Sequence, residues 1–403
     1  MSKSLTPSIT PKLNLALIIT VLITGALAFI QVYAIQSVLP VLMQEFHASA
    51  AAIGSTVGAT ILAVALTSPF LGMISDAFGR KAFIVGSVFF IAIPTLALSF
   101  VHSINWLWWL RFAQGVAVPG ITVVLLAYLG EEFSGNTRIK LMSFYVSGTV
   151  LGGFLGRFLM GYLTDFMGWR HAFLIMGIIS ISGAVLVWKN LPASQKFEAK
   201  PQISTALITL WHHLHNRYIL AACALGFCVL FSLVGCFTYI NLYLDQPPYN
   251  LSSSQLANIF AVYLIGMVIT PLSARLIVKF GTNLTVLIAM SLSIFGVLIT
   301  LMHPLWVIEL ALAIMSSGIF ITQSSTITYI SANVTEGRSL ASGLYYMCYY
   351  AGGFAGSLLC GHAFESGGWF MTAVVLISVQ LLAMLIGGVL MRKKSINRNI
   401  ETI

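Results

Sequence analysis

The sequence predicts an all-α membrane protein with 12 transmembrane helices in two six-helix bundles. Two observations predict this fold class. Of the 403 residues, 58% are hydrophobic and 8% are charged, whereas soluble domains carry about 25% charged residues. The hydrophobic residues also gather in runs of about 20, the length that crosses a hydrocarbon core about 30 Å thick. A water-soluble fold of this length could not cover its surface with so few charges.

The hydrophobic runs define the expected spans. We place them at residues 15–41, 53–74, 82–101, 107–129, 140–164, 171–189, 217–243, 255–275, 284–302, 304–330, 339–364 and 369–391. The first run is too long for the core of a signal peptide, and no small-residue cleavage site follows it. We therefore expect it to be retained as the first span.

The positions of the basic residues indicate the orientation in the membrane. If both termini are cytoplasmic, the cytoplasmic segments hold 17 of the 20 Lys and Arg residues, and the outer loops hold only Arg170. This asymmetry is what the positive-inside rule describes. We therefore expect a multi-pass protein of a bacterial inner membrane with both termini in the cytoplasm. The formal charge of +9 then reflects topology, and nucleic acid is not an expected partner.

An internal repeat divides the chain into two halves. The stretch 152–156 matches 352–356 at an offset of 200, and Gly168-Trp169 matches Gly368-Trp369 at the same offset. Repeats of six spans keep the same orientation, so the halves are expected to be parallel repeats. A hydrophilic stretch separates them. We expect an N-terminal bundle at 1–189, a cytoplasmic linker at 190–216 and a C-terminal bundle at 217–403.

Glycines recur every fourth residue on the fifth and eleventh expected spans. In lipid, small residues at this spacing let two helix backbones approach closely. Two interpretations stay open, namely static packing and a seam along which helices slide or hinge during transport. The glycines concerned are Gly148, Gly152 and Gly156 in the first half and Gly352 and Gly356 in the second.

Two motifs resemble the major facilitator superfamily. The loop from Gly72 to Lys81 reads GMISDAFGRK, which is similar to that family's signature loop, G-x-x-x-D-x-x-G-R-K/R. The stretch 111–115 reads RFAQG and resembles the second motif of the drug/proton antiporter branch. The antiporter glycine motif is matched only in part, because Gly153 replaces its proline and Arg157 its last glycine. The resemblance implies a secondary transporter with alternating access.

The resemblance also implies a gate at the signature loop. Asp76 would face the start of the eleventh span near Arg338, with Arg80 and Arg138 nearby, while Gly72 and Gly79 shape the loop. The alternative is a solvated acid in a loop that only sets the topology.

Three ionisable residues fall inside the expected spans, namely Arg111, Arg157 and Glu309. Each costs about 2.5 kcal/mol or more at the bilayer centre unless it is paired or hydrated. We expect them to share a cavity with a net positive charge. The resemblance implies that Arg111 influences proton transfer, and Glu309, the carboxylate within a span, is the expected proton carrier. Snorkelling to the membrane surface is the alternative for Arg111 and Glu309.

Polar and aromatic side chains on spans 1, 7 and 11 offer an expected substrate surface. Aromatic walls with few fixed charges suit amphiphilic organic molecules. Packing is the alternative explanation for each tyrosine. The residues are Gln31, Tyr33, Gln36, Asn241, Tyr345 and Tyr349, with Tyr346 and Tyr350 on the same span as the last two.

Three functions follow as hypotheses. The first is proton-coupled efflux of a small organic solute or drug. The second is an organic anion carrier that uses Arg111 and Arg157 to bind a carboxylate, and the third is a non-transport membrane scaffold. No Walker loop, serine elbow or His-Glu-x-x-His motif is present, so we expect no enzyme activity. We expect a monomer that contacts substrate, protons and lipid, without cofactor or metal.

Overall fold

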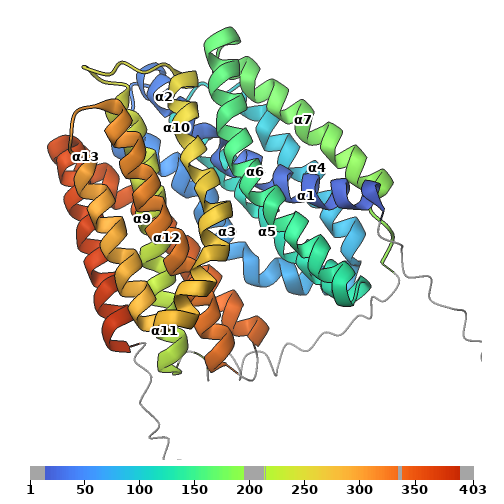
Figure 1. Cartoon of the computed structure of the whole chain (residues 1–403). Helices are drawn as coiled ribbons and strands as arrows, with labels where there is room; N and C mark the ends of the chain where they lie inside the picture. Colours follow the sequence, from blue (N-terminus) through green and yellow to red (C-terminus); the bar gives the residue numbers. More distant parts are fainter. Residues whose placement is uncertain (1–13, 195–212, 214, 335–337, 391–403) are drawn as a thin grey trace, which may run out of the picture.

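The computed structural model describes residues 14–194, 213, 215–334 and 338–390 (Figure 1). Every regular element in these ranges is a helix, which confirms the all-α prediction. The first half contains α1 (Leu15–Tyr33), η1 (Ala34–Val38), α2 (Leu39–Glu45), α3 (Ala50–Phe78), α4 (Arg80–Leu98), α5 (Ile104–Glu132), α6 (Gly135–Met167) and α7 (Trp169–Asn190). The second contains α9 (Arg217–Leu244), α10 (Ser253–Ile259), η2 (Phe260–Leu264), α11 (Ile265–Ile299), α12 (Leu305–Asn333) and α13 (Arg338–Leu390).

The helices account for the 12 expected spans. In the described ranges, 10 helical segments are long and apolar enough to cross a membrane. Two of them contain two spans each, because α11 bends at Gly281, whose φ is 75°, and α13 bends at Gly367 and Gly368. Gly281 and Gly368 have a positive φ, a conformation that favours glycine. The helices also extend several residues beyond the expected spans, as α6 does relative to 140–164.

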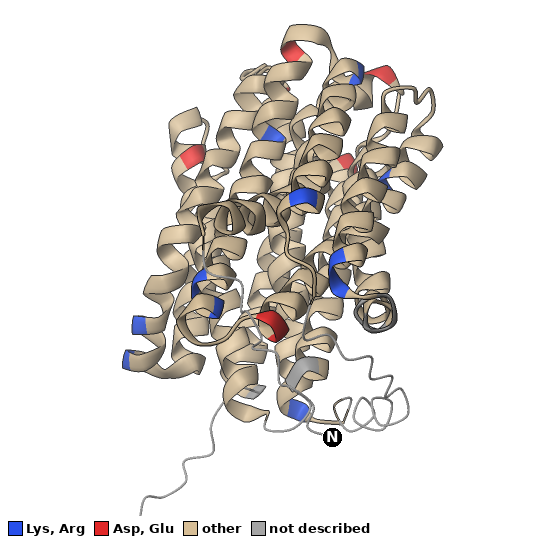
Figure 2. Ribbon diagram, turned by 90° about the vertical axis from the view of Figure 1, so that its right-hand side faces the viewer, with Lys and Arg blue, Asp and Glu red and all other residues tan. Residues whose placement is uncertain are grey.

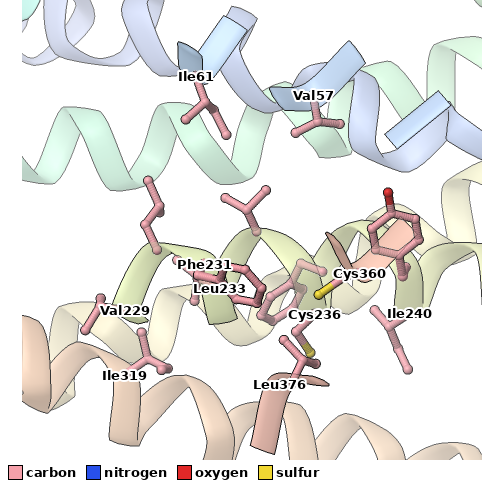
Figure 3. Packing of buried hydrophobic residues seen from close by; sticks show 14 of the residues in the cluster. Val57, Ile61, Val229, Phe231, Leu233, Cys236, Ile240, Ile319, Cys360 and Leu376 are labelled. Atoms are coloured by element: carbon pink, nitrogen blue, oxygen red, sulfur yellow. The ribbon is translucent and has the colours of Figure 1, made fainter. Parts of the chain in front are cut away.

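We call α1 to α7 the N-terminal half and α9 to α13 the C-terminal half. The division at 190–216 stays a prediction, since 195–212 and 214 lie outside the described residues. One hydrophobic cluster crosses between the halves. It includes Val57 and Ile61 of α3 and Phe231 and Leu233 of α9, which Figure 3 shows on opposite helices. A second cluster lies within residues 17–191.

The glycine ladders pack helices inside each half. A Cβ atom at Gly152 of α6 would lie 2.6 Å from the Cα atom of Ala26 on α1. At the equivalent place in the other half, a Cβ atom at Gly352 of α13 would lie 2.6 Å from the Cα atom of Phe227 on α9. Gly148, Gly156 and Gly356 meet the same two neighbouring helices. These contacts favour the packing interpretation, because neither ladder lies between the two halves.

Charged residues separate along the bundle axis. Figure 2 shows most Asp and Glu residues toward one end and most Lys and Arg residues toward the other. We call these the acidic end and the basic end. Glu45 and Asp165, near the ends of α2 and α6, and Glu365, bonded to the start of α3, belong to the acidic end. Lys81 and Lys140, near the starts of α4 and α6, belong to the basic end. The two ends lie on opposite sides of the apolar bundle.

Candidate functional site

Arg157 is a fully buried cation at the interface between the two halves. At Gly156, α6 lies in close contact with Ile30 of α1. The side chain of Arg157, the next residue, therefore reaches the end of α1. The Nε and Nη2 atoms of Arg157 donate to Gln36 Oε1 over 2.8 and 2.6 Å, and Nη1 donates to the carbonyl oxygen of Gly153 over 2.8 Å. One neutral amide oxygen thus receives two donors of the guanidinium group.

Aromatic rings from both halves surround Arg157. Its Cζ atom lies 4.4 Å from each of three ring centroids, those of Tyr33 on α1 and of Phe260 and Tyr263 on η2. Aromatic faces stabilise a cation that lacks water. Neither Arg157 nor Arg111 forms an ion pair in the described part of the chain. The positive charge of Arg157 therefore has an amide partner and aromatic partners, and these come from both halves. If the transporter alternates between two states, the halves move relative to each other and these contacts change.

Gln36 connects Arg157 to the C-terminal half. Its Nε2 atom donates to Thr238 Oγ1 over 3.1 Å, and its carbonyl oxygen accepts from Asn241 Nδ2 over 2.9 Å. The carbonyl of Gln36 can accept this bond because Pro40, four residues later, has no N–H to donate to it. The sequence therefore carried a signal for this site in the spacing of Gln36 and Pro40.

Asn241 leaves one acceptor available beside Gln36. Its Nδ2 atom donates to the carbonyl oxygens of Gln36 and Phe237, over 2.9 and 3.1 Å. Two carbonyl partners fix the orientation of the amide group. Its Oδ1 atom is buried and has no hydrogen-bond partner among the described residues. A substrate donor or a water molecule would satisfy this oxygen.

Arg111 is equally buried but lies inside the N-terminal half. Its guanidinium group donates to the carbonyl oxygens of Gln31 and Val32 over 2.7 and 2.5 Å, and to Gln114 Oε1 over 2.6 Å. These carbonyls end α1, where the helix changes to the 3-10 segment η1, so a cation is favourable there. The expectation that Arg111 shares a cavity with Arg157 is wrong, because its hydrogen bonds fix helices of one half.

Two further site expectations are corrected by geometry. The Nε2 atom of Gln31 donates to Ser180 Oγ over 2.8 Å and to the carbonyl oxygen of Met176 over 3.2 Å, so Gln31 joins α1 to α7. Glu309 is exposed on α12, next to the exposed Leu310. It therefore does not face the arginines, because a carboxylate near the end of a span can point outward from the bundle as well as inward.

The tyrosines of α13 form two layers. Tyr345 and Tyr349, which the sequence singled out, are 1% and 8% exposed. Tyr349 accepts a hydrogen bond from Gln323 Nε2 over 3.1 Å. Tyr346, in contrast, is 39% exposed, and Tyr350 is partly exposed. The accessible aromatic surface therefore belongs to the second pair, and the first pair packs behind it.

The signature loop is only partly described. Gly79, with a φ of 89°, separates α3 from α4. Arg80 binds both carboxylate oxygens of Glu131, with Nη2–Oε1 at 2.6 Å and Nε–Oε2 at 3.1 Å. Arg138 is exposed. The side chains of Asp76 and Arg338 lie outside the described residues, so the gate between them stays a prediction. Glu131 is a partner that sequence reasoning missed.

Two carboxylates close the acidic end in a reciprocal arrangement. Asp165 of α6 accepts from the backbone N–H of Ser254 over 2.9 Å, at the start of α10. Glu365 of α13 accepts from the backbone N–H of Ala51 over 2.8 Å, at the start of α3. The two acids are related by the repeat offset of 200. Each caps a helix N-terminus of the opposite half, where negative charge is stabilising.

Glycines bring these helices together below the caps. A Cβ atom at Gly161 of α6 would lie 2.6 Å from the Cβ atom of Ala257 on α10. A Cβ atom at Gly361 of α13 would lie 2.6 Å from the Cα atom of Ala51 on α3. The halves are therefore in close contact on the acidic side of Arg157. In the described ranges, no group of three or more His, Cys, Asp or Glu residues is placed to hold a metal ion.

Two bundles of apolar helices with a polar site between them define a membrane transporter. The family model of the Major Facilitator Superfamily matches residues 21–357, and the chain belongs to this superfamily. It is 29% identical to the inner membrane transport protein YnfM of Escherichia coli, over 92% of this chain and 89% of that protein. It is 25% identical to the chloramphenicol resistance protein CraA of Acinetobacter baumannii, over 76% of each chain.

A solved structure agrees with this fold. The chain resembles a bacterial homolog of the human lysosomal transporter Spinster in an inward-facing and occupied conformation, with a TM-score of 0.76 and 17% identity. The likeness covers 93% of this chain and 96% of that one. At this identity the likeness concerns the fold. The prediction of a 12-helix major facilitator fold is therefore confirmed.

Proposed function

We propose that this chain transports a small organic anion across a bacterial inner membrane and that Arg157 binds the anionic group. The observation that carries the proposal is the fully buried guanidinium group of Arg157, which lies between the halves and has no ion pair in the described chain. A buried charge without a counterion is costly. An anionic substrate would supply that counterion.

The geometry of Arg157 suits a carboxylate. Its Nε and Nη2 atoms now share the single Oε1 atom of Gln36. A carboxylate offers two coplanar oxygens, which a guanidinium group binds in a bidentate and charge-assisted way. The substrate would therefore displace Gln36 and bind with one more acceptor than the amide provides.

The closed acidic end supports alternating access. The positive-inside rule makes the basic end cytoplasmic and the acidic end external, with both termini in the cytoplasm. The reciprocal caps of Asp165 and Glu365 then close the external side. Because the site lies between the two halves of one chain, which can move relative to each other, we propose a monomer as the transporting unit.

The proposal is tested by flux measurements in proteoliposomes. Labelled organic carboxylates are offered to the wild-type protein and to Arg157→Gln and Arg157→Lys variants. Because a hydrogen-bonded charge contributes about 1.5–3 kcal/mol, Arg157→Gln should lower the apparent affinity about 10-fold or more. Arg157→Lys should be intermediate, because an ammonium group keeps the charge but loses the planar fork.

Lys140→Gln is the matched control, since Lys140 is exposed on the same helix. Its flux should equal that of the wild-type protein. Carboxylate flux that is unchanged in Arg157→Gln would overturn the proposal.

Proton-coupled efflux of an uncharged drug is the second candidate function. It is favoured by the relationship to CraA and by the resemblance of residues 111–115 to the antiporter motif. This candidate predicts drug resistance on overexpression and drug-dependent proton movement in proteoliposomes, both independent of the charge at position 157. The anion carrier predicts neither result for neutral drugs.

A further inference from the structure

We infer that the transported anion carries a planar aromatic group, which binds against four tyrosines next to Arg157. This inference rests on the proposed function and narrows its substrate class. We call the four residues Tyr33, Tyr263, Tyr346 and Tyr350 the tyrosine wall. Tyr33, Tyr263 and Tyr350 are partly exposed, and Tyr346 is 39% exposed.

The wall joins residues of both halves. Tyr33 and Tyr350 both pack against the hydrophobic cluster of the N-terminal half, although Tyr350 belongs to α13. The ring of Tyr346 lies beside that of Tyr350, with their centroids 6.4 Å apart. Tyr350, with Tyr346 next to it, therefore lies at the boundary between the halves. Since Tyr33 and Tyr263 also pack on the guanidinium group of Arg157, the wall and the cation form one continuous site.

The depth of the wall argues against an interfacial role. Tyr346 and Tyr350 follow the start of α13 at Arg338 by eight and 12 residues. At about 1.5 Å per residue, they lie roughly 12 and 18 Å from that end. Tyrosines that anchor a helix at the membrane surface lie at the headgroup level. The wall therefore lies within the span. By the repeat offset of 200, Arg157 corresponds to Ser357, which follows Tyr350 by 7 residues, so the wall extends from Arg157 toward the basic end.

The chemistry of the wall selects an aromatic partner. Its rings already interact with their neighbours, with centroids 5.3 Å apart for Tyr345 and Tyr346 and 5.4 Å apart for Tyr349 and Tyr350. A substrate ring at a similar separation would add offset or edge-to-face contacts, which exceed simple burial of the same area. An aliphatic ring of equal size would gain burial alone. The ligand that matches both parts of the site is an aromatic carboxylate.

Three matched ligands separate the charge from the ring. Benzoate, cyclohexanecarboxylate and benzamide are titrated calorimetrically into purified protein in lipid nanodiscs, with empty nanodiscs as blanks. We expect benzoate to bind about three- to tenfold more tightly than cyclohexanecarboxylate, from the size of aromatic pair energies. Benzamide, which lacks the charge, should show no saturable binding.

Variants assign the preference to the wall. In Tyr346→Leu and Tyr350→Leu, the affinities for benzoate and cyclohexanecarboxylate should become about equal. The Tyr346→Phe and Tyr350→Phe variants should keep the tighter binding of benzoate, because stacking needs the ring and not the hydroxyl. Tyr218→Leu is the control, since Tyr218 is a partly exposed tyrosine at the basic end of α9. Thermal unfolding of each variant confirms that the protein is folded.

The outcomes distinguish the two proposals. Equal binding of both acids, lost in Arg157→Gln, would overturn the aromatic inference and leave the anion carrier standing. Equal binding of benzoate and benzamide would overturn the anion carrier. Absence of saturable binding by either acid would overturn both.

Discussion

Arg111 and Arg157 are the same residue type in the same bundle, and both are fully buried, but their partners differ in kind. Arg111 binds backbone carbonyls and Gln114 within the N-terminal half. Arg157 binds Gln36 and aromatic rings drawn from both halves. Burial of a charge therefore does not by itself identify a substrate site. Contacts within one half stabilise the fold, whereas contacts between the halves are available to change during transport.

The largest expected effect is the loss of stability in Arg111→Leu. Removing this guanidinium group removes its hydrogen bonds to the carbonyl oxygens of Gln31 and Val32, and a hydrogen bond to a charged group contributes about 1.5–3 kcal/mol. Arg157→Leu should cost less stability, since a single side-chain oxygen, Gln36 Oε1, loses its donors, while Gln36 keeps its bonds to Thr238 and Asn241. Thermal unfolding in detergent checks the difference. Equal losses of stability in the two variants would contradict the distinction.

A smaller effect is expected at Thr238, which links Gln36 to the C-terminal half. Thr238→Val keeps the shape of the side chain and removes the acceptor of Gln36 Nε2. A net hydrogen bond contributes about 0.5–1.5 kcal/mol, so substrate affinity should change about two- to tenfold with little change in unfolding temperature. Thr326→Val is the control, because its hydroxyl bonds within its own helix. A fall in stability without a change in affinity would place Thr238 among the structural residues.

The reciprocal caps extend the comparison to the acidic end. Replacing Asp165 and Glu365 by alanine removes two favourable helix-terminus interactions, worth about 0.3–1 kcal/mol each. The acidic end should open more often, and labelling of an Ala257→Cys variant by an impermeant maleimide should rise, because Ala257 is buried against Gly161.

Glu45→Gln is the control for the caps, since Glu45 binds Trp169 and Arg170 within one half. It should leave the labelling of Ala257→Cys unchanged. If Glu45→Gln raises the labelling as much as the double alanine variant does, the two caps have no special role in closing this end.

The smallest effect is expected for Glu309. This carboxylate is exposed on α12, away from the contacts within one half that Arg111 makes and from the contacts between the halves that Arg157 makes. Glu309→Gln should therefore leave stability, substrate flux and any proton movement close to wild-type values in proteoliposomes. Loss of proton movement in this variant would restore Glu309 as the proton carrier. It would also show that a functional residue can lie outside the contacts between the halves.

Two residues that the sequence singled out, Arg157 and Gln36, are joined by hydrogen bonds in the structure. The intramembrane cost of a cation pointed to Arg157, and the glutamine at position 36 was also predicted. Sequence reasoning did not find Thr238, Phe260 and Tyr263, because hydrophobic pattern and spacing carry no information on which residues of distant helices meet. It also grouped Arg111 and Glu309 with Arg157, since all three lie at similar depths and depth does not specify the direction of a side chain.

By itself, the sequence determined the helical class, the spans and the repeat, because lipid requires long apolar segments and two related halves leave matching glycines. Only the tertiary structure decided which buried arginine lies between the halves, which tyrosines are accessible and which carboxylates cap the opposite half. Those properties depend on the rotation of each helix about its axis and on its neighbours, which are fixed when distant parts of the chain pack together.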